Sequence, residues 1–100
     1  MAIAVVLRFK GASLEQYDQV VERMGFEHSR AGAAGGVFHW VTQTEEGLQI
    51  TDVWESRDVF ERFAREEIMP HTAAVGITEQ PEIAYYEVHN YLTAGQAVTA

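Results

Sequence analysis

The stretch GVFHWVTQTEEGLQITDVWES, residues 36–56, decides the fold. Two runs rich in β-branched and aromatic residues, at about 37–44 and 48–55, are joined through the polar segment EEG, and this pattern predicts a β-hairpin. Phe38 and Trp40 share one face of the first strand, yet the residues between and beside them are also largely apolar. A sheet in a small protein commonly keeps one face in water. The hairpin therefore raises the question of what covers its second face.

A helix is predicted on the N-terminal side of the hairpin, over residues 14–24. Ser13 followed by Gln16 is a capping-box signature, and Gly25 suits a left-handed C-terminal cap. The Gly-rich segment that follows, residues 27–36, is predicted to be a loop. Helical spacing places four side chains of the helix on one face, namely Leu14, Tyr17, Val21 and Met24.

A second helix is predicted on the C-terminal side, with Ser56 as its N-cap. We expect it to end before Pro70, because proline disfavours helical geometry in the residue before it. Its apolar stripe consists of Val59, Phe60, Phe63, Ala64 and Ile68.

Strands predicted over residues 2–9 and 82–92 complete the pattern. The order β-α-β-β-α-β predicts an α+β, ferredoxin-like fold, a four-stranded antiparallel sheet. Right-handed crossovers place both helices on one face of that sheet. We expect residues 1–92 to form a single domain and 93–100 a frayed tail.

Composition excludes several classes of protein. The chain has 100 residues, a formal net charge of −8 at pH 7 and no cysteine. The negative charge and the lack of a Lys/Arg cluster argue against nucleic acid and anionic membranes as partners. Without cysteine there is no disulfide framework and no thiolate nucleophile. With neither a signal peptide nor a bilayer-length apolar run visible, we expect a cytoplasmic protein.

Neither face of the predicted sheet is polar throughout. In the first strand Ile3, Val5 and Leu7 form one alternation, while Ala4 and Val6 belong to the other. Exposing such a face would create a larger apolar patch than monomers usually carry. The sequence therefore predicts a homodimer whose sheets pack face to face around a two-fold axis.

The element order, the chain length and the segments VWESRDVFERF (53–63) and MPH (69–71) resemble the dimeric α+β barrel superfamily, in particular the antibiotic-biosynthesis-monooxygenase-like proteins. The resemblance extends over about residues 2–92. It implies a dimeric α+β barrel with a cavity between helices and sheet in each protomer. The superfamily includes cofactor-independent oxygenases, heme-degrading oxygenases and cyclases, so the fold does not choose a reaction.

The heme-degrading branch is similar in only one position. That branch has an Asn on the first strand, a Trp in the middle of the second helix and a His near the end of that helix. Here the corresponding residues are Arg8, Phe63 and His71. Because only His71 fits, the resemblance does not extend to heme degradation, and heme binding through His71 is kept as an alternative.

His39 and Asp52 are the first candidate catalytic pair. If the connection runs over four residues, 44–47, the two side chains face each other across the hairpin, and the carboxylate would orient the imidazole as a base. If the connection is the three-residue EEG, they lie on opposite faces and form no pair. The alternative is an exposed histidine beside an aspartate satisfied by backbone or solvent.

His71, after Pro70, is the other candidate base, although a histidine there also suits the negative end of a helix dipole. Arg8 is the one charge in an apolar strand, and we expect it to pair with Glu87 or to hold an anionic substrate. The remaining candidates are aromatic residues that would line a substrate cavity or pack in the core, namely Trp54, Trp40, Phe63, Tyr85 and Tyr86.

No metal-ligand spacing and no phosphate-binding glycine loop is visible, so we expect neither a metal nor another cofactor. The sequence leads to two classes of function. One is a cofactor-independent monooxygenase-like or cyclase-like enzyme acting on a small aromatic or polyketide-like substrate in an apolar cavity. The other is a non-catalytic module for ligand binding or dimerisation.

Overall fold

The structure is a computed structural model and describes residues 1–26 and 33–92. The predicted tail, 93–100, and most of the predicted loop lie outside these residues. The elements follow in the order β1 (Ile3–Lys10), α1 (Leu14–Met24), β2 (Gly36–Gln43), β3 (Gly47–Trp54), α2 (Arg57–Phe63), η1 (Ala64–Ile68), α3 (Met69–Ala74) and β4 (Glu82–Glu87).

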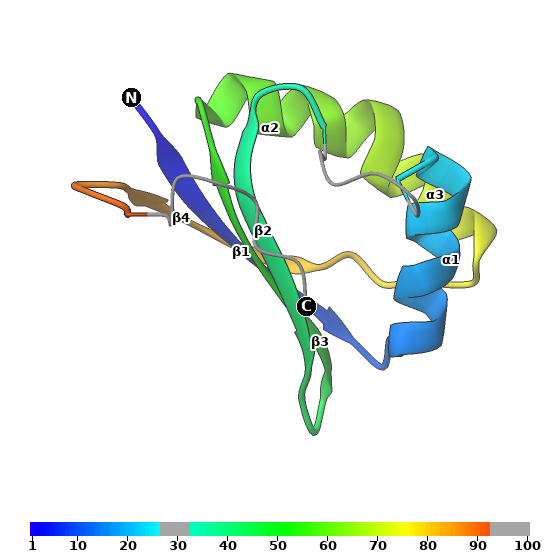
Figure 1. The fold of residues 1–100 in the computed structure, drawn as a ribbon. Coiled ribbons are helices and arrows are strands. Elements are labelled where there is room, and N and C mark those ends of the chain that lie inside the picture. Colours follow the sequence, from blue (N-terminus) through cyan, green and yellow to red (C-terminus); the bar gives the residue numbers. More distant parts are fainter. Residues whose placement is uncertain (27–32, 93–100) are drawn as a thin grey trace.

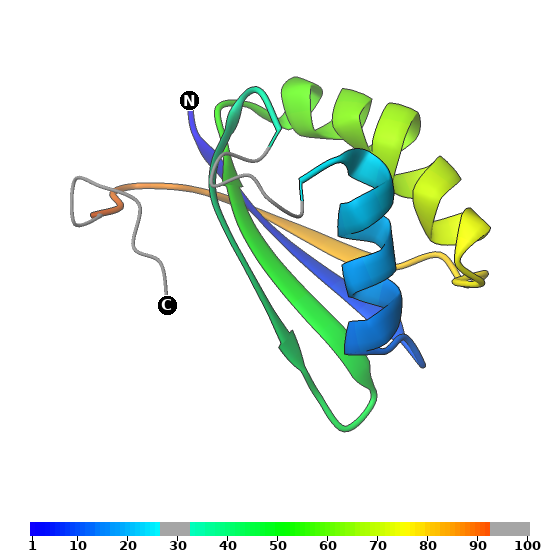
Figure 2. The ribbon, with the colours of Figure 1, turned by 45° about the vertical axis from the view of Figure 1, so that its right-hand side comes forward.

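The strands form a four-stranded sheet in the order β2-β3-β1-β4, with every neighbouring pair antiparallel. All of the helices lie on one face of this sheet (Figures 1 and 2). On that face α1 crosses β2 and β3, and the α2-to-α3 segment runs beside it. The predicted ferredoxin-like α+β fold is therefore confirmed. We call the sheet face opposite the helices the open face.

The core lies between the sheet and the helices. One alternation of β1 is buried there, and Phe60 of α2 covers it with no exposed surface. Burying a side chain of this size contributes roughly 1.5–3 kcal/mol. The buried apolar cluster consists of Val5, Leu7, Phe9, Ala12, Leu48, Trp54 and Phe60.

Helix α1 has the predicted ends, and three residues of the predicted face, Tyr17, Val21 and Met24, are half-buried. Ser13 and Gln16 form a capping box, and Gly25 closes the helix at φ 83°. However, Leu14 is 41% exposed, whereas Val20 is 7% exposed and packs inward. The amide nitrogen of Gln16 donates a 3.2 Å hydrogen bond to the carbonyl oxygen of Val75, the residue that follows α3.

The prediction that the second helix ends before Pro70 is wrong. Helical turns continue through α2, η1 and α3, and η1 is a π-helical segment in which the Met69 N–H bonds to the Ala64 carbonyl five residues back. A wide turn just before proline accommodates its missing N–H donor without ending the helix. The helix therefore continues past Pro70 to Ala74, and His71 lies in its last turn.

Strand β4 is shorter than predicted because its neighbour, β1, begins only at Ile3. Glu87 pairs with Ile3, the first residue of β1, and the Val88 N–H makes one more bond to the Ala2 carbonyl. Beyond this point the chain has no strand beside it to pair with. The predicted strand 82–92 therefore ends at Glu87.

Candidate functional site

The hairpin register brings His39 and Asp52 directly opposite each other. Thr44 and Gly47 exchange backbone hydrogen bonds of 2.8 and 3.3 Å, and two residues, Glu45 and Glu46, make the turn. The four-residue connection is thus the one found, and both side chains point toward the helices.

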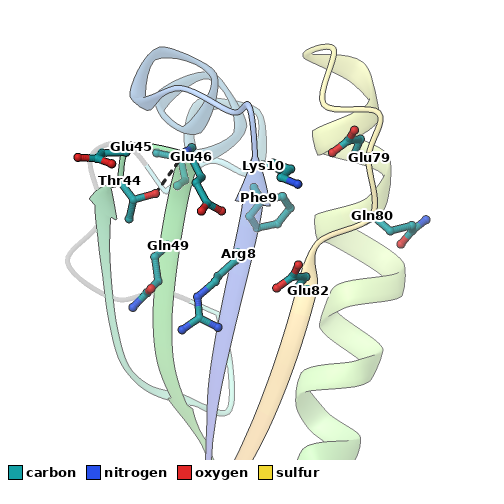
Figure 3. A pocket seen from close by; sticks show the side chains of 12 residues that line it. Arg8, Phe9, Lys10, Thr44, Glu45, Glu46, Gln49, Glu79, Gln80 and Glu82 are labelled. Carbon is teal, nitrogen blue, oxygen red and sulfur yellow. Dashed lines mark hydrogen bonds between the residues drawn. The ribbon is translucent and has the colours of Figure 1, made fainter.

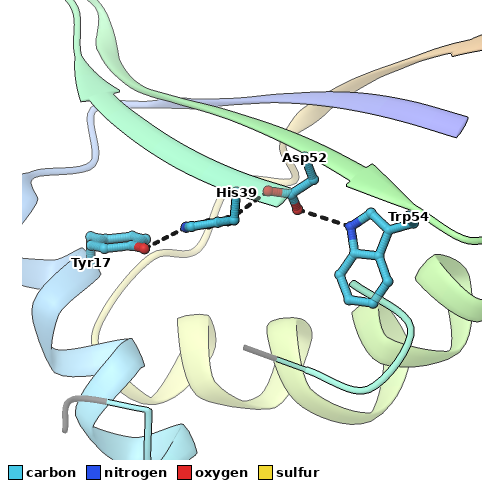
Figure 4. A network of polar contacts seen from close by, with 4 residues as sticks. All are labelled: Tyr17, His39, Asp52 and Trp54. Carbon is cyan, nitrogen blue, oxygen red and sulfur yellow. Dashed lines mark hydrogen bonds and ion pairs between the residues drawn. The ribbon is translucent and has the colours of Figure 1, made fainter. Parts of the chain in front are cut away.

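Four side chains form a continuous chain of hydrogen bonds beneath the helices (Figure 4). The Nδ1 of His39 lies 2.6 Å from Oδ1 of Asp52, and its Nε2 lies 2.5 Å from the hydroxyl of Tyr17. The second carboxylate oxygen, Oδ2, accepts a 3.0 Å bond from the indole N–H of Trp54. Helix α1 and strands β2 and β3 therefore meet in one polar network.

The partners of His39 indicate which ring nitrogen carries the hydrogen. A carboxylate only accepts, so Nδ1 of His39 carries the hydrogen shared with Asp52. In a neutral imidazole Nε2 is then an acceptor, and the Tyr17 hydroxyl donates to it. This arrangement holds the ring in one tautomer with its basic nitrogen turned toward Tyr17.

The network runs from the core to the surface. Asp52 is 5% exposed, whereas the His39 side chain is 47% exposed. Burial, and then the nearby negative charges of Asp52 and Asp18, raise the pKa of Tyr17 to about 12. A buried carboxylate beside a partly exposed imidazole can orient that imidazole as a base.

Aromatic rings line the buried end of the network. The Trp54 ring lies 5.0 Å from that of Phe63 and 5.6 Å from that of Phe60, measured between centroids. Trp54 and Phe63, two predicted substrate-binding residues, are therefore neighbours. Their packing also serves the core, since such pairs add about 0.5–1.5 kcal/mol beyond area burial.

His71 does not join this network among the contacts of the described residues. Its Nδ1 accepts a 3.3 Å bond from Nε of Arg23 on α1, and its Nε2 lies 3.6 Å from a carboxylate oxygen of Glu67. The structure thus separates the two predicted catalytic histidines. His71 links the helices to one another, while His39 links α1 to the sheet.

The two neighbouring tyrosines of β4 point to opposite faces, as predicted. Tyr85 packs edge-on against Phe60, and its hydroxyl donates a 3.4 Å bond to Glu61. Burial, and then the Glu61 charge, raise the pKa of Tyr85. Tyr86 lies on the open face with Trp40, and neither side chain contacts the His39 network.

Arg8 is not buried, and its expected pairing with Glu87 is wrong. The β1–β4 register places Glu82 opposite Arg8 and puts Glu87 beside Ile3 at the other end of the strand. Arg8 is exposed on the open face, so it needs no buried partner. The error arose because β4 pairs with β1 antiparallel from its first residue.

A pocket of about 520 Å³ lies at the hairpin end of the sheet (Figure 3). Charged and polar side chains such as Arg8, Lys10, Gln49 and Glu82 line it. It does not lie between the helices and the sheet, where the resemblance placed a cavity, and it does not include the His39 network. Its mixed charges distinguish it from the apolar pockets that usually hold small aromatic ligands.

Residues 1–26 and 33–92 contain neither a metal-ligand cluster nor a membrane-spanning helix. No cluster of three or more His, Cys, Asp or Glu side chains there is placed to hold a metal ion. None of the helices in the same ranges has the length and apolar character needed to cross a membrane.

Sequence reasoning did not identify Tyr17 as a partner of His39. It appeared only as one member of an apolar helix face, although a buried tyrosine hydroxyl needs a hydrogen-bond partner. That need was the available signal.

Solved structures with the same fold include enzymes. SnoaB of Streptomyces nogalater, a cofactor-independent oxygenase, superposes with a TM-score of 0.61 at 21% identity, covering 91% of this chain and 96% of its own. A Streptomyces coelicolor monooxygenase, solved with nanaomycin D, gives 0.57 at 14% identity over 94% and 92% of the two chains. A Deinococcus radiodurans protein assigned as an antibiotic biosynthesis monooxygenase gives 0.54 at 19% identity over 96% and 100%.

No family profile and no curated protein matches the sequence. At these low identities the structural likeness shows the fold alone. The chain has the fold of the antibiotic-biosynthesis-monooxygenase-like proteins.

Proposed function

We propose that this protein is a cofactor-independent, monooxygenase-like enzyme in which His39 removes a proton from a small aromatic or polyketide-like molecule. The observation that carries the proposal is the 2.6 Å contact between Nδ1 of His39 and the buried carboxylate of Asp52. Asp52 orients the ring and stabilises the imidazolium that forms when the base takes a proton.

The chemistry needs an acidic O–H on the substrate. Loss of the proton from a phenol or enol leaves an electron-rich anion. A C–H carbon of that anion adds dioxygen, and the peroxide formed takes a proton back from protonated His39 to give a hydroperoxide. Loss of water from the hydroperoxide leaves a carbonyl, so the substrate supplies all the electrons. Alternatively the same anion cyclises without oxygen. Both routes use His39 in one role.

Two features support this reading over the alternative base, His71. Hydrogen bonds to Tyr17 and Asp52 hold both nitrogens of the His39 ring. Asp52 in turn bonds to Trp54, whose ring packs against Phe63. The His71 ring contacts an arginine and lies outside this arrangement. Solved proteins of this fold that act as oxygenases add support at the level of fold only.

We also propose that the protein is a homodimer through the open face. Phe38, Trp40 and Tyr86 lie there with 53%, 43% and 58% of their surface exposed. Aromatic residues of this size are enriched at interfaces between subunits.

Oxygen consumption with a panel of phenols and naphthols tests the enzymatic proposal. We expect wild-type protein to turn over at least one of them, and His39→Gln to lose at least about 100-fold of that rate, the usual lower bound for a general base. His71→Gln, the matched control, is expected to leave the rate nearly unchanged. Saturable binding without turnover would favour the non-catalytic ligand-binding module instead.

A further inference from the structure

Both ring nitrogens of His39 are already engaged. Nδ1 is bound by Asp52, and Nε2 accepts from the Tyr17 hydroxyl at 2.5 Å. A base acts through a lone pair within about 2.6–3.2 Å of the proton it takes. In this arrangement the only lone pair of the imidazole is covered by Tyr17.

Tyr17 is held in that position by packing. Its ring is nearly parallel to the His39 ring, with an interplanar angle of 11° and centroids 5.9 Å apart. It also packs against the buried core cluster, and α1 is anchored by its capping box at Ser13. Swinging the ring away would break these contacts together, so displacing Tyr17 is the costlier route to Nε2.

We propose that Tyr17 relays the proton from the bound molecule to His39. The O–H bond of the molecule breaks as a new O–H bond forms on Oη of Tyr17, while the original Oη–H bond breaks and a hydrogen is bound at Nε2 of His39. The molecule is left as an anion and His39 as a cation beside Asp52. Tyr17 is neutral before and after, and no oxidant is required.

The charges around Tyr17 suit a concerted transfer. Asp52 and Asp18 face it, and together with burial they raise its pKa to about 12, so a lasting phenolate is disfavoured. A hydroxyl that gives one proton while taking another avoids that phenolate. The inference rests on the proposed role of His39 as the base, and the experiment is built to separate the two.

The probe is 4-nitrophenol, whose neutral and anionic forms absorb at different wavelengths. The full-length protein is titrated into 4-nitrophenol at a pH below the pKa of the free phenol. The bound phenol is expected to be more ionised than the free phenol. Tyr17→Phe is expected to bind it with similar affinity, while the ionisation constant of the bound phenol falls about tenfold, which is one pKa unit. The control, Tyr91→Phe, changes an exposed tyrosine and should behave as wild type.

The outcomes separate the relay from the base. If Tyr17→Phe, folded by circular dichroism, ionises the phenol as well as wild type or better, the relay is overturned and Tyr17 is at most a gate. If His39→Gln ionises it as wild type does, the base assignment is overturned. Failure of wild type to bind or ionise 4-nitrophenol overturns both.

Discussion

Trp54 donates its indole N–H to Oδ2 of Asp52 at 3.0 Å, from a position two residues further along the same strand. Residues two apart on a strand share a face, so β3 itself aligns the donor with the carboxylate. Both residues are buried, and the carboxylate therefore depends on its protein partners rather than on water. The other oxygen of the same carboxylate holds His39, which makes Trp54 a support for the proposed base.

Trp54→Phe tests that support. The substitution keeps an aromatic ring in the core but removes the donor to Oδ2 of Asp52. A buried acceptor left unpaired costs about 1–3 kcal/mol, so we expect the free energy of unfolding in urea to fall by about that amount. Trp40→Phe on the open face is the matched control, and equal stability of the two variants would contradict the role given to the indole.

Asp52→Asn tests the control of the His39 tautomer. An amide side chain can present either an oxygen or an N–H to Nδ1, so the ring is no longer held in one form. We expect two-bond proton–nitrogen spectra to show the Nδ1–H tautomer alone in the wild type and a mixture in the variant. An unchanged single tautomer would mean that Tyr17, rather than Asp52, fixes the ring.

The hairpin could be predicted because local rules determine it. Alternation placed His39 and Asp52 on their strands, and only the length of the turn decided whether they met. The glycine at the start of β3, Gly47, and the two glutamates before it settled that length in favour of the pair. From the sequence alone, the four-residue connection that pairs His39 with Asp52 and the three-residue connection that separates them were both open.

The remainder depended on contacts between distant segments. The hydrogen bond from Gln16 to the Val75 carbonyl, which ties α1 to the end of α3, joins residues 59 apart in the sequence. The register that puts Glu82, not Glu87, opposite Arg8 depends on where β4 begins to pair. Helical spacing and alternation contain neither kind of information.

High pH provides a test of the environment of Tyr17. Its pKa is about 12 in the folded protein against 10.0 for the free side chain, because it is buried near Asp52 and Asp18. The native state holds the proton more tightly, so this contribution to stability is complete below pH 10 and is lost as the pH rises toward 12. We expect the stability of wild type to fall toward that of Tyr17→Phe over this range in urea unfolding experiments. A constant difference between the two proteins would contradict the shift.

Gly47→Ala tests the turn that sets the register. A Cβ at this position would lie 2.1 Å from the Phe9 carbonyl oxygen and 2.7 Å from the Gly11 nitrogen, at a φ of +155°. The Phe9 carbonyl belongs to β1, and the Gly11 N–H bonds to the Glu46 carbonyl in the turn, so neither atom can move without disturbing these contacts. We therefore expect a loss of at least about 1–3 kcal/mol in urea unfolding. Gly11→Ala is the control, because its φ is also positive but nothing lies within 4 Å of the added carbon. Equal losses would show that backbone conformation alone, not the close approach, requires glycine at 47.

The last prediction concerns the open face, whose two halves differ in polarity. The half that contains Phe38, Trp40 and Tyr86 is aromatic, while the half near the hairpin turn contains Arg8 and the polar pocket. A second copy is expected to cover the aromatic half, since burying it removes apolar surface from water at about 25 cal/mol per Å².

Sedimentation at micromolar concentration should therefore show a dimer for wild type and a monomer for Trp40→Lys, in which a charge would be buried without a partner. Leu92→Lys adds the same charge at an exposed apolar residue outside the sheet and should remain dimeric. Because His39 points to the opposite face from Trp40, the monomeric variant should still ionise bound 4-nitrophenol. A wild-type chain that sediments as a monomer would remove the proposed interface without affecting the His39 network.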